Sequence, residues 1–338
     1  MVPLDPPRQS LQAQTRAFLT AVSFDNDGAM VELMEVTSGL AGPEGPVALA
    51  DGSVLVVETL AGRVTRILPD GSHVTVSEPG GGPNGLAIGP DGRCYVCNNG
   101  GLTADDIAWL QVPEPETYER DVPPFSGRIE VIDLADGTTD VLYDRASGEQ
   151  LVAPNDLVFD ESGGFWFTDF GSLFHRGPQP GWVCYATVDG TRADRVIGPL
   201  ERTNGVGLSP DGRELYVSET WSGRLWAFEV LGPGQVVTAA GVGCGGRLVV
   251  EPPEARLDSL AVEADGHVCV AGTVGNYIAR IAPADGSFEE VPTPAEFATN
   301  ICFGGADLQT AYVTCHGGGG VLLSGRWPGP GLRLPFNA

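Results

Sequence analysis

The sequence contains no lysine, and all 19 of its basic residues are arginines. A covalent Schiff base needs a lysine amine, so ordinary pyridoxal-phosphate enzymes and lysine-dependent aldolases are excluded. A Walker A phosphate loop also needs a lysine and is excluded with them. The 44 acidic residues give a net charge of −25. Nucleic acid and anionic membrane surfaces are therefore unexpected partners, because both bind basic footprints, whereas a divalent cation would be attracted.

Cysteine is scarce as well, with 7 residues in 338. Cys94 and Cys97 lie in a segment with strand character, so their side chains face opposite ways and a shared zinc ion is not expected. Without a second such pair, we expect reduced core thiols. The first 30 residues contain no apolar run of signal-peptide length, and no stretch approaches the ~20 apolar residues of a membrane span. These absences predict a cytoplasmic protein. Its expected partner is a small-molecule substrate, and its oligomeric state stays open.

An internal repeat organises the chain. In five segments a polar residue is followed by apolar residues and, eight positions later, by the glycine of an Asp-Gly or Ser-Gly turn; a sixth, looser copy follows. Each copy continues into a run of aromatic or β-branched residues, and this pattern is typical of a β-hairpin. The residues that lead the six copies are Glu44, Asn84, Asn155, Asn204, Asp258 and Asn300.

The repeat predicts an all-β fold. A further strand signal follows each hairpin, so each of the six units holds about four antiparallel strands, and radial packing of such sheets is the β-propeller. A solenoid is disfavoured, because helices are nearly absent and no capping repeat is present. Residues 31–36 are expected to pair with the last blade near 321–323 and to close the ring. We therefore expect an extension over 1–30, one six-bladed propeller over 31–338, and a lid-like insertion at 101–126.

The leading residues carry the candidate chemistry. Equivalent positions in a propeller lie at equal distances from its axis, so six oxygen-bearing side chains would converge at one mouth of the channel. A single Asn or Asp more often satisfies a turn backbone, but Glu44 is unusual in a turn and the six together favour a functional ring. Carboxylate and amide oxygens suit Ca²⁺, Mg²⁺ or Mn²⁺. The candidate substrate-binding residues are Asn84, Asn99, Trp109 and His175.

The motifs resemble those of the regucalcin (senescence marker protein)–gluconolactonase family of six-bladed propellers. The resemblance covers about residues 38–325 and implies that Glu44, Asn204 and Asp258 hold a metal ion, with Asn155 in the metal shell or against substrate. Two departures from the family pattern, Val47 after the Glu-Gly-Pro motif and a Leu-Asp-Ser in place of Pro-Asp-Gly, leave the substrate open. The matching segments are Glu44-Gly45-Pro46, Pro154-Asn155-Asp156, Asn204-Gly205, Asp258 before Asp265-Gly266, and 299–307.

We therefore expect a hydrolase of a lactone or related cyclic ester that depends on one divalent ion. Ca²⁺ is favoured, with Mg²⁺, Mn²⁺ or Zn²⁺ as alternatives. The metal would polarise the carbonyl for attack by water, with Asp258 as the base or orienting carboxylate and His175 as the alternative base. Two alternatives stay open: a phosphotriesterase or carbon–carbon bond-forming enzyme on the same scaffold, and a binding propeller whose metal is only structural.

Overall fold

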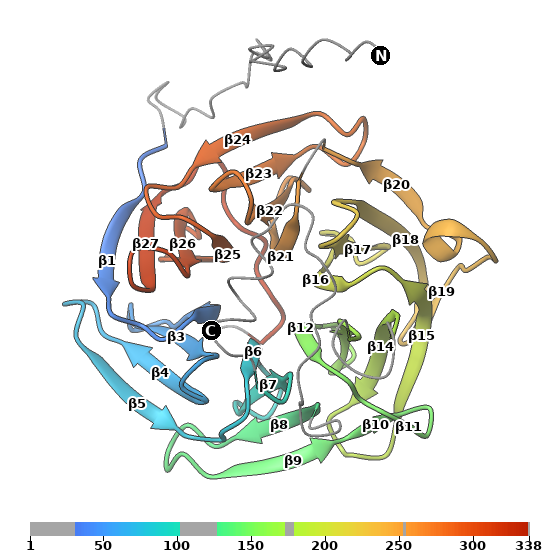
Figure 1. The fold of residues 1–338 in the computed structure, drawn as a ribbon, viewed down its shortest axis with the longest axis horizontal. Coiled ribbons are helices and arrows are strands. Elements are labelled where there is room, and N and C mark those ends of the chain that lie inside the picture. Colours follow the sequence, from blue (N-terminus) through green and yellow to red (C-terminus); the bar gives the residue numbers. More distant parts are fainter. Residues whose placement is uncertain (1–30, 102–126, 173–178, 253–254, 337–338) are drawn as a thin grey trace, which may run out of the picture.

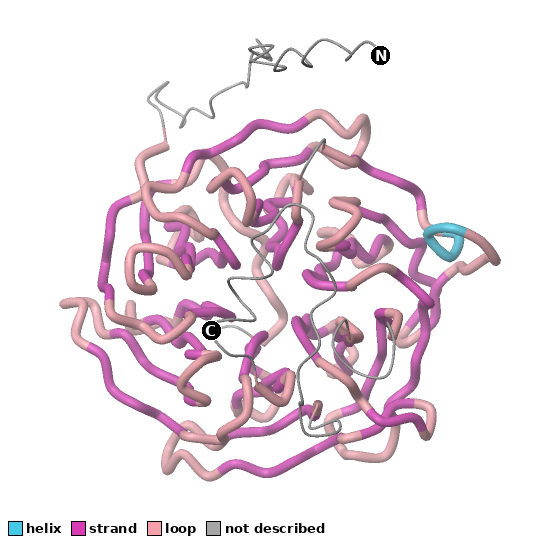
Figure 2. Tube along the Cα trace, viewed as in Figure 1, coloured by secondary structure: helices cyan, strands magenta, loops and turns pink. Residues whose placement is uncertain are grey.

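The computed structural model describes residues 31–101, 127–172, 179–252 and 255–336. Within them helix is confined to one short 3₁₀ turn, η1 (Val242–Gly245), and the strands form six main sheets arranged around a channel (Figures 1 and 2). The predicted six-bladed all-β propeller is confirmed. The expected extension over 1–30 and the expected lid, apart from Gly101, lie outside the described residues. No described segment forms a helix that is long and apolar enough to cross a membrane.

Each blade is an antiparallel sheet whose strands follow one another from the channel outward (Figure 1). Blade 1 contains β2 (Pro43–Ala48), β3 (Val54–Glu58), β4 (Arg63–Ile67) and β5 (His73–Ser77). Blade 2 contains β6 (Pro83–Ile88), β7 (Cys94–Asn98), β8 (Arg128–Ile132) and β9 (Thr139–Tyr143). Blade 3 contains β12 (Pro154–Phe159), β13 (Gly164–Asp169), β14 (Gly181–Thr187) and β15 (Ala193–Leu200), after a small hairpin of β10 (Arg145–Ala146) and β11 (Glu149–Gln150).

Blade 4 departs from the expected four strands, because two short strands share its outer edge and both pair with the third strand. It contains β16 (Thr203–Leu208), β17 (Glu214–Glu219), β18 (Leu225–Gly232), β19 (Gln235–Val236) and β20 (Arg247–Val250). Blade 5 contains β21 (Leu257–Val262), β22 (Val268–Gly272), β23 (Tyr277–Ile281) and β24 (Phe288–Pro292). Blade 6 contains β25 (Ala298–Gly304), β26 (Thr310–Cys315), β27 (Val321–Arg326) and, from the other end of the domain, β1 (Met34–Ser38).

The ring closes as expected. Strand β1 pairs antiparallel with β27, with Glu35 opposite Leu323 and Ser38 opposite Val321. The strand begins at Met34 rather than at Val31, because Val31 and Leu33 enter the hydrophobic cluster between blades 5 and 6. The last blade is thus built from both ends of the propeller.

The hydrophobic core lies mainly between neighbouring blades. One cluster, for example, joins Val57 of blade 1 to Val96 of blade 2, and another joins Tyr216 of blade 4 to Val270 of blade 5. Each sheet therefore buries side chains against both of its neighbours, which is the packing that radial sheets require. All seven cysteines are free, and Cys94 and Cys97 are fully buried as expected of core thiols.

A carboxyl-terminal segment, residues 327–336, crosses the channel at the end away from the leading residues (Figure 1). The Trp327 indole donates a hydrogen bond to Glu263 of blade 5 (2.9 Å), and Leu332 donates its backbone N–H to the Val262 carbonyl (2.8 Å). Further along, Phe336 packs edge-on against Phe159 of blade 3. The repeat pattern contains no signal for this segment, and the sequence analysis did not anticipate it.

The closeness of the inner strands gives a test of this packing. Gly45 has a φ of +50°, and a Cβ added there would lie 2.4 Å from the Asn84 carbonyl oxygen of the next blade. Gly92 also has a positive φ (+75°) but has no atom within 4 Å of an added Cβ. We expect Gly45→Ala to lower the free energy of unfolding by about 2 kcal/mol more than Gly92→Ala. Urea unfolding of both variants measures this, and equal losses would mean that the blades do not meet so closely.

Candidate metal centre

The six inner strands share a β-bulge at or beside the leading residue, and this bulge sets the direction of the leading side chain. In all six inner strands the pairing register shifts at or directly beside the leading residue, for example between Glu44 and Val47 in β2 and between Thr203 and Val206 in β16. An extra residue at such a bulge turns a side chain away from its regular direction, and bulges are common beside functional sites. The leading residues are thereby buried at one end of the channel, above the apolar residues of the same strands.

Glu44 of blade 1 is almost completely buried. Its Oε2 accepts hydrogen bonds from the Gly45 backbone N–H (2.8 Å) and from the Asn300 side-chain amide of blade 6 (3.1 Å). Burial raises the pKa of Glu44 well above its ordinary value, and the charge of Asp258 raises it further. The two carboxylates therefore act on each other across the channel.

Asp258 of blade 5 is held beside Asn204 of blade 4. Its Oδ1 accepts the Ser259 backbone N–H (3.1 Å), and a hydrogen bond from Asn204 stabilises its ionised form. Burial outweighs these bonds and raises the pKa of Asp258 to about 7. The Asn204 amide is oriented in turn, because its nitrogen donates to Thr220 Oγ1 (3.0 Å) and its oxygen accepts the Ser259 hydroxyl (3.3 Å).

Asp156 is a third buried carboxylate that the sequence analysis did not place in the site. Burial raises its pKa to about 7, although the Leu157 backbone N–H donates a hydrogen bond to it (2.9 Å). Its charge raises the pKa of both Glu44 and Asp258. The sequence contained one indication of this role. The residue that follows the leading one is glycine in three repeats, and it is acidic only in the third repeat, where it is Asp156.

Asn84 and Asn155 are both buried, and the side-chain carbonyl oxygen of each has no hydrogen-bond partner among the described residues. Unpaired buried carbonyl oxygens are rare and call for a ligand. Asn99 is only half-buried, and its side-chain oxygen already accepts the Gly101 N–H (3.0 Å) as a turn cap. The other two expected substrate contacts, Trp109 and His175, lie outside the described residues.

These donors suit a hard divalent cation. Three buried carboxylates act on one another here, although their ligand atoms do not all lie within 4.8 Å of one another, and no arginine or histidine forms an ion pair with them in the part of the chain that the structure describes. Burying several like charges together is unfavourable unless a positive charge joins them. Oxygen-only donors with two unsatisfied amide oxygens match the coordination that Ca²⁺, Mg²⁺ or Mn²⁺ takes.

Residues 42–317 match the sequence profile described as the SMP-30/Gluconolactonase/LRE-like region. The chain belongs to this family. A gluconolactonase of Zymomonas mobilis is 26% identical over 228 residues, and the match covers 58% of this chain and 54% of that protein. Lactonase drp35 of Staphylococcus aureus is 27% identical over 177 residues, or 52% of this chain and 47% of that protein. The chain thus spans about half the length of the curated relatives it matches.

Several solved structures have the same fold as this member of the SMP-30/gluconolactonase family. A gluconolactonase from Xanthomonas campestris superposes with a TM-score of 0.68 at 23% identity, covering 88% of this chain and 90% of that one. A calcium-binding regucalcin from Agrobacterium tumefaciens gives 0.64 at 16% identity, covering 88% and 95%. At such identities the likeness shows the fold alone, and it agrees with the resemblance seen in the repeat motifs.

A second group of acidic residues lies in blade 5, where an arginine pairs with its buried carboxylate. Glu263, Asp265 and His267 have ligand atoms within 4.8 Å of one another in blade 5. However, Arg280 donates to both oxygens of Glu263 (2.6 and 2.9 Å), and Trp327 donates to it as well. The Glu263 carboxylate therefore holds the carboxyl-terminal segment, and the group is a weaker candidate for a metal than the channel site.

His316 lies near the mouth, beside the Pro43 backbone that precedes Glu44. Both of its ring nitrogens are buried, and neither makes a hydrogen bond of normal geometry within the part of the chain that the structure describes. Burial lowers the pKa of His316 to about 4. The ring is therefore neutral at pH 7 and has an unshared lone pair.

The raised pKa values predict how the metal-free protein responds to pH. Unfolded Asp ionises near pH 4, whereas folded Asp156 and Asp258 keep their protons until about pH 7. Between these values the folded state binds more protons, so its stability falls as the pH rises. We expect Asp156→Asn to flatten this fall, while the exposed Asp140→Asn leaves it unchanged. Urea unfolding in chelator from pH 4 to 8 checks this, and identical slopes in all three proteins would contradict it.

Proposed function

We propose that this protein is a divalent-metal-dependent hydrolase that opens a lactone or related cyclic ester. The observation that carries the proposal is the electrostatic interaction of Glu44, Asp156 and Asp258, three buried carboxylates without a cationic partner among the described residues. The names of the relatives, gluconolactonase and lactonase, support this substrate class. Ca²⁺ is the favoured ion, since the donors are oxygens and the similar regucalcin is described as calcium-binding.

Glu44, Asn155, Asn204 and Asp258 would hold the ion, and Asp156 adds charge beside them. When bound, the ion would polarise the ester carbonyl and stabilise the negative charge that develops on its oxygen. The fixed hydrogen bonds of Glu44 and Asn204 mean that the donors need little rearrangement to do so. Such pre-positioning is what electrostatic catalysis requires.

Asp258 is the proposed catalytic carboxylate. The Ser259 N–H fixes one of its oxygens, so the other can face a water molecule that attacks the ester. Neutral His316, with its unpaired ring nitrogens, is a second group that could take the proton. Asn84 would accept a hydrogen bond from a substrate hydroxyl through its unpaired oxygen. The substrate thus lies between a charged centre and a polar rim.

Substitution of the ligands tests the metal assignment. Glu44→Gln and Asp258→Asn should each lower the affinity for the divalent ion at least about tenfold, since Ca²⁺ affinity depends on the number of ligand charges. Lactone hydrolysis should fall with it. Asp265→Asn, in the second acidic group, is the matched control and should retain both. Calcium titration by calorimetry together with elemental analysis measures the effect, and full occupancy in both channel variants would rule out this centre.

Turnover separates the enzyme from a binding propeller. We expect the protein to hydrolyse at least one member of a panel of sugar and aliphatic lactones. The reaction is measured by pH-stat titration of the released acid. Chelator should abolish this activity and added Ca²⁺ should restore it, because the carbonyl is then polarised again. A parallel panel of phosphotriesters covers the alternative chemistry. Metal binding without turnover on either panel would favour a structural metal.

A further inference from the structure

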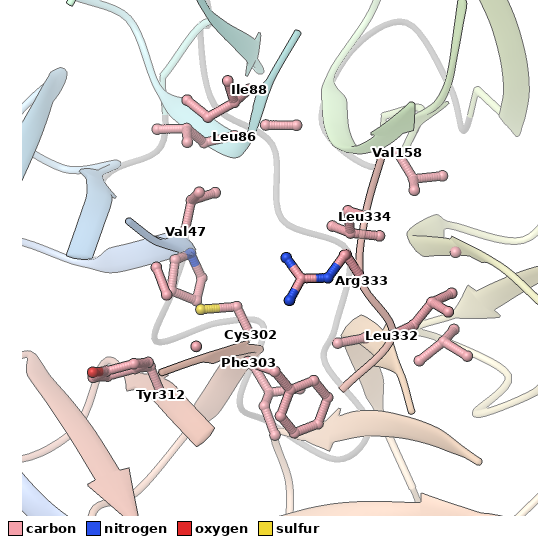
Figure 3. A pocket seen from close by; sticks show the side chains of 18 of the residues that line it. Val47, Leu86, Ile88, Val158, Cys302, Phe303, Tyr312, Leu332, Arg333 and Leu334 are labelled. Atoms are coloured by element: carbon pink, nitrogen blue, oxygen red, sulfur yellow. The ribbon is translucent and has the colours of Figure 1, made fainter. Parts of the chain in front are cut away.

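The channel holds a cavity of about 350 Å³ that extends from Asp156 toward the end of the channel away from Glu44 and Asp258 (Figure 3). Its volume lies at the lower end of the range for small-molecule pockets. All six inner strands contribute to the wall, and most of the lining side chains are apolar. They include Val47, Leu86, Val158, Leu208, Val262 and Phe303.

The direction of the inner strands places this cavity apart from the candidate metal centre. Glu44 lies near the start of strand β2, and the chain continues past Val47 and the end of the strand to the turn at Gly52. Most residues from Gly45 to this turn line the cavity. Asp156 and Asn300 lie at its inner end, where they border the acidic site. The two sites are therefore stacked along one axis, with Asp156 between them.

The carboxyl-terminal segment forms part of the outer wall and is firmly held. The backbone N–H of Gly331 donates to the Leu308 carbonyl (2.8 Å), and that of Leu332 donates to the Val262 carbonyl (2.8 Å). Leu332 and Leu334 pack against the hydrophobic clusters of blades 3 to 5. These contacts hold the backbone around Arg333 at the mouth of the cavity, and the Arg333 side chain is exposed there.

The Arg333 guanidinium points into the space enclosed by these apolar side chains (Figure 3). It forms no ion pair or hydrogen bond in the part of the chain that the structure describes, whereas ten other described arginines each pair with a carboxylate. In a chain with a net charge of −25, an arginine facing an apolar cavity without a carboxylate is a position suited to an external anion.

We infer that this cavity binds a small apolar monocarboxylate. The carboxylate would pair with Arg333, a charge-assisted contact whose planar geometry suits the guanidinium. The hydrocarbon body would lie among the apolar side chains of the inner strands, with a gain that scales with the area removed from water. A second anionic group at the far end of the ligand would meet Asp156, so dicarboxylates are disfavoured.

Three eight-carbon probes of similar length test this chemistry: octanoate, neutral 1-octanol and the dicarboxylate suberate. Calorimetric titration of the full chain should show saturable binding of one octanoate. Octanol and suberate should bind at least about tenfold more weakly, the first because it lacks the charge and the second because it carries two. No saturable octanoate binding, or equal binding of octanol, would overturn the inference.

Variants then locate the binding. Arg333→Gln should weaken octanoate binding at least about tenfold, and Arg333→Lys should bind with intermediate affinity because it keeps the charge but loses the planar two-point contact. The exposed Arg326→Gln, in the same terminal region, is the control and should bind normally. Val47→Phe should fill the cavity, and the three probes on unchanged protein remain decisive if it fails to fold. Binding must also persist in Glu44→Gln protein with chelator, since loss there would place octanoate at the acidic site.

Discussion

Repulsion among three buried carboxylates is the constraint on which the rest of the structure depends. Glu44, Asp156 and Asp258 come from blades 1, 3 and 5 and act on one another through an interior of low polarity. The pleated sheets alone do not oppose this repulsion. It is opposed by the hydrophobic clusters between neighbouring blades, which resist any widening of the ring, and by the β1–β27 pairing that closes it. The carboxylates can therefore stay close to the channel axis only because the packed and closed ring holds the blades in place.

The sequence predicted the fold because one periodic signal carried most of the information. A polar residue, an apolar strand and a glycine turn recur six times, and this fixes the number of blades and the inner position of each leading residue. It also placed the closing strand to within a few residues. The charge pattern and the scarcity of cysteine added the chemical class of the donors.

Other features could not be predicted because they depend on geometry that the repeat does not encode. Asp156 enters the site because a bulge in β12 turns the segment between Pro154 and Leu157, and a single sequence does not show where a bulge falls. The carboxyl-terminal segment has no periodicity, and its course depends on particular contacts such as that of Trp327 with Glu263. Blade 4 gained an extra edge strand for a similar reason, since the glycine-rich turn before Arg247 interrupts its outer edge.

The composite last blade also bears on how the protein comes to be made. During synthesis β1 emerges first, yet its partner β27 is among the last strands to leave the ribosome. Until then β1 has an unpaired edge, and an unpaired strand edge is a place where a nascent chain can associate wrongly. The exposure of β1 in the folded protein is consistent with a strand that stays unpaired during synthesis, because Met34 and Glu35 are exposed rather than buried. A strand that is half polar and short is a poor template for other chains, and it gains its full stability only when the ring is complete.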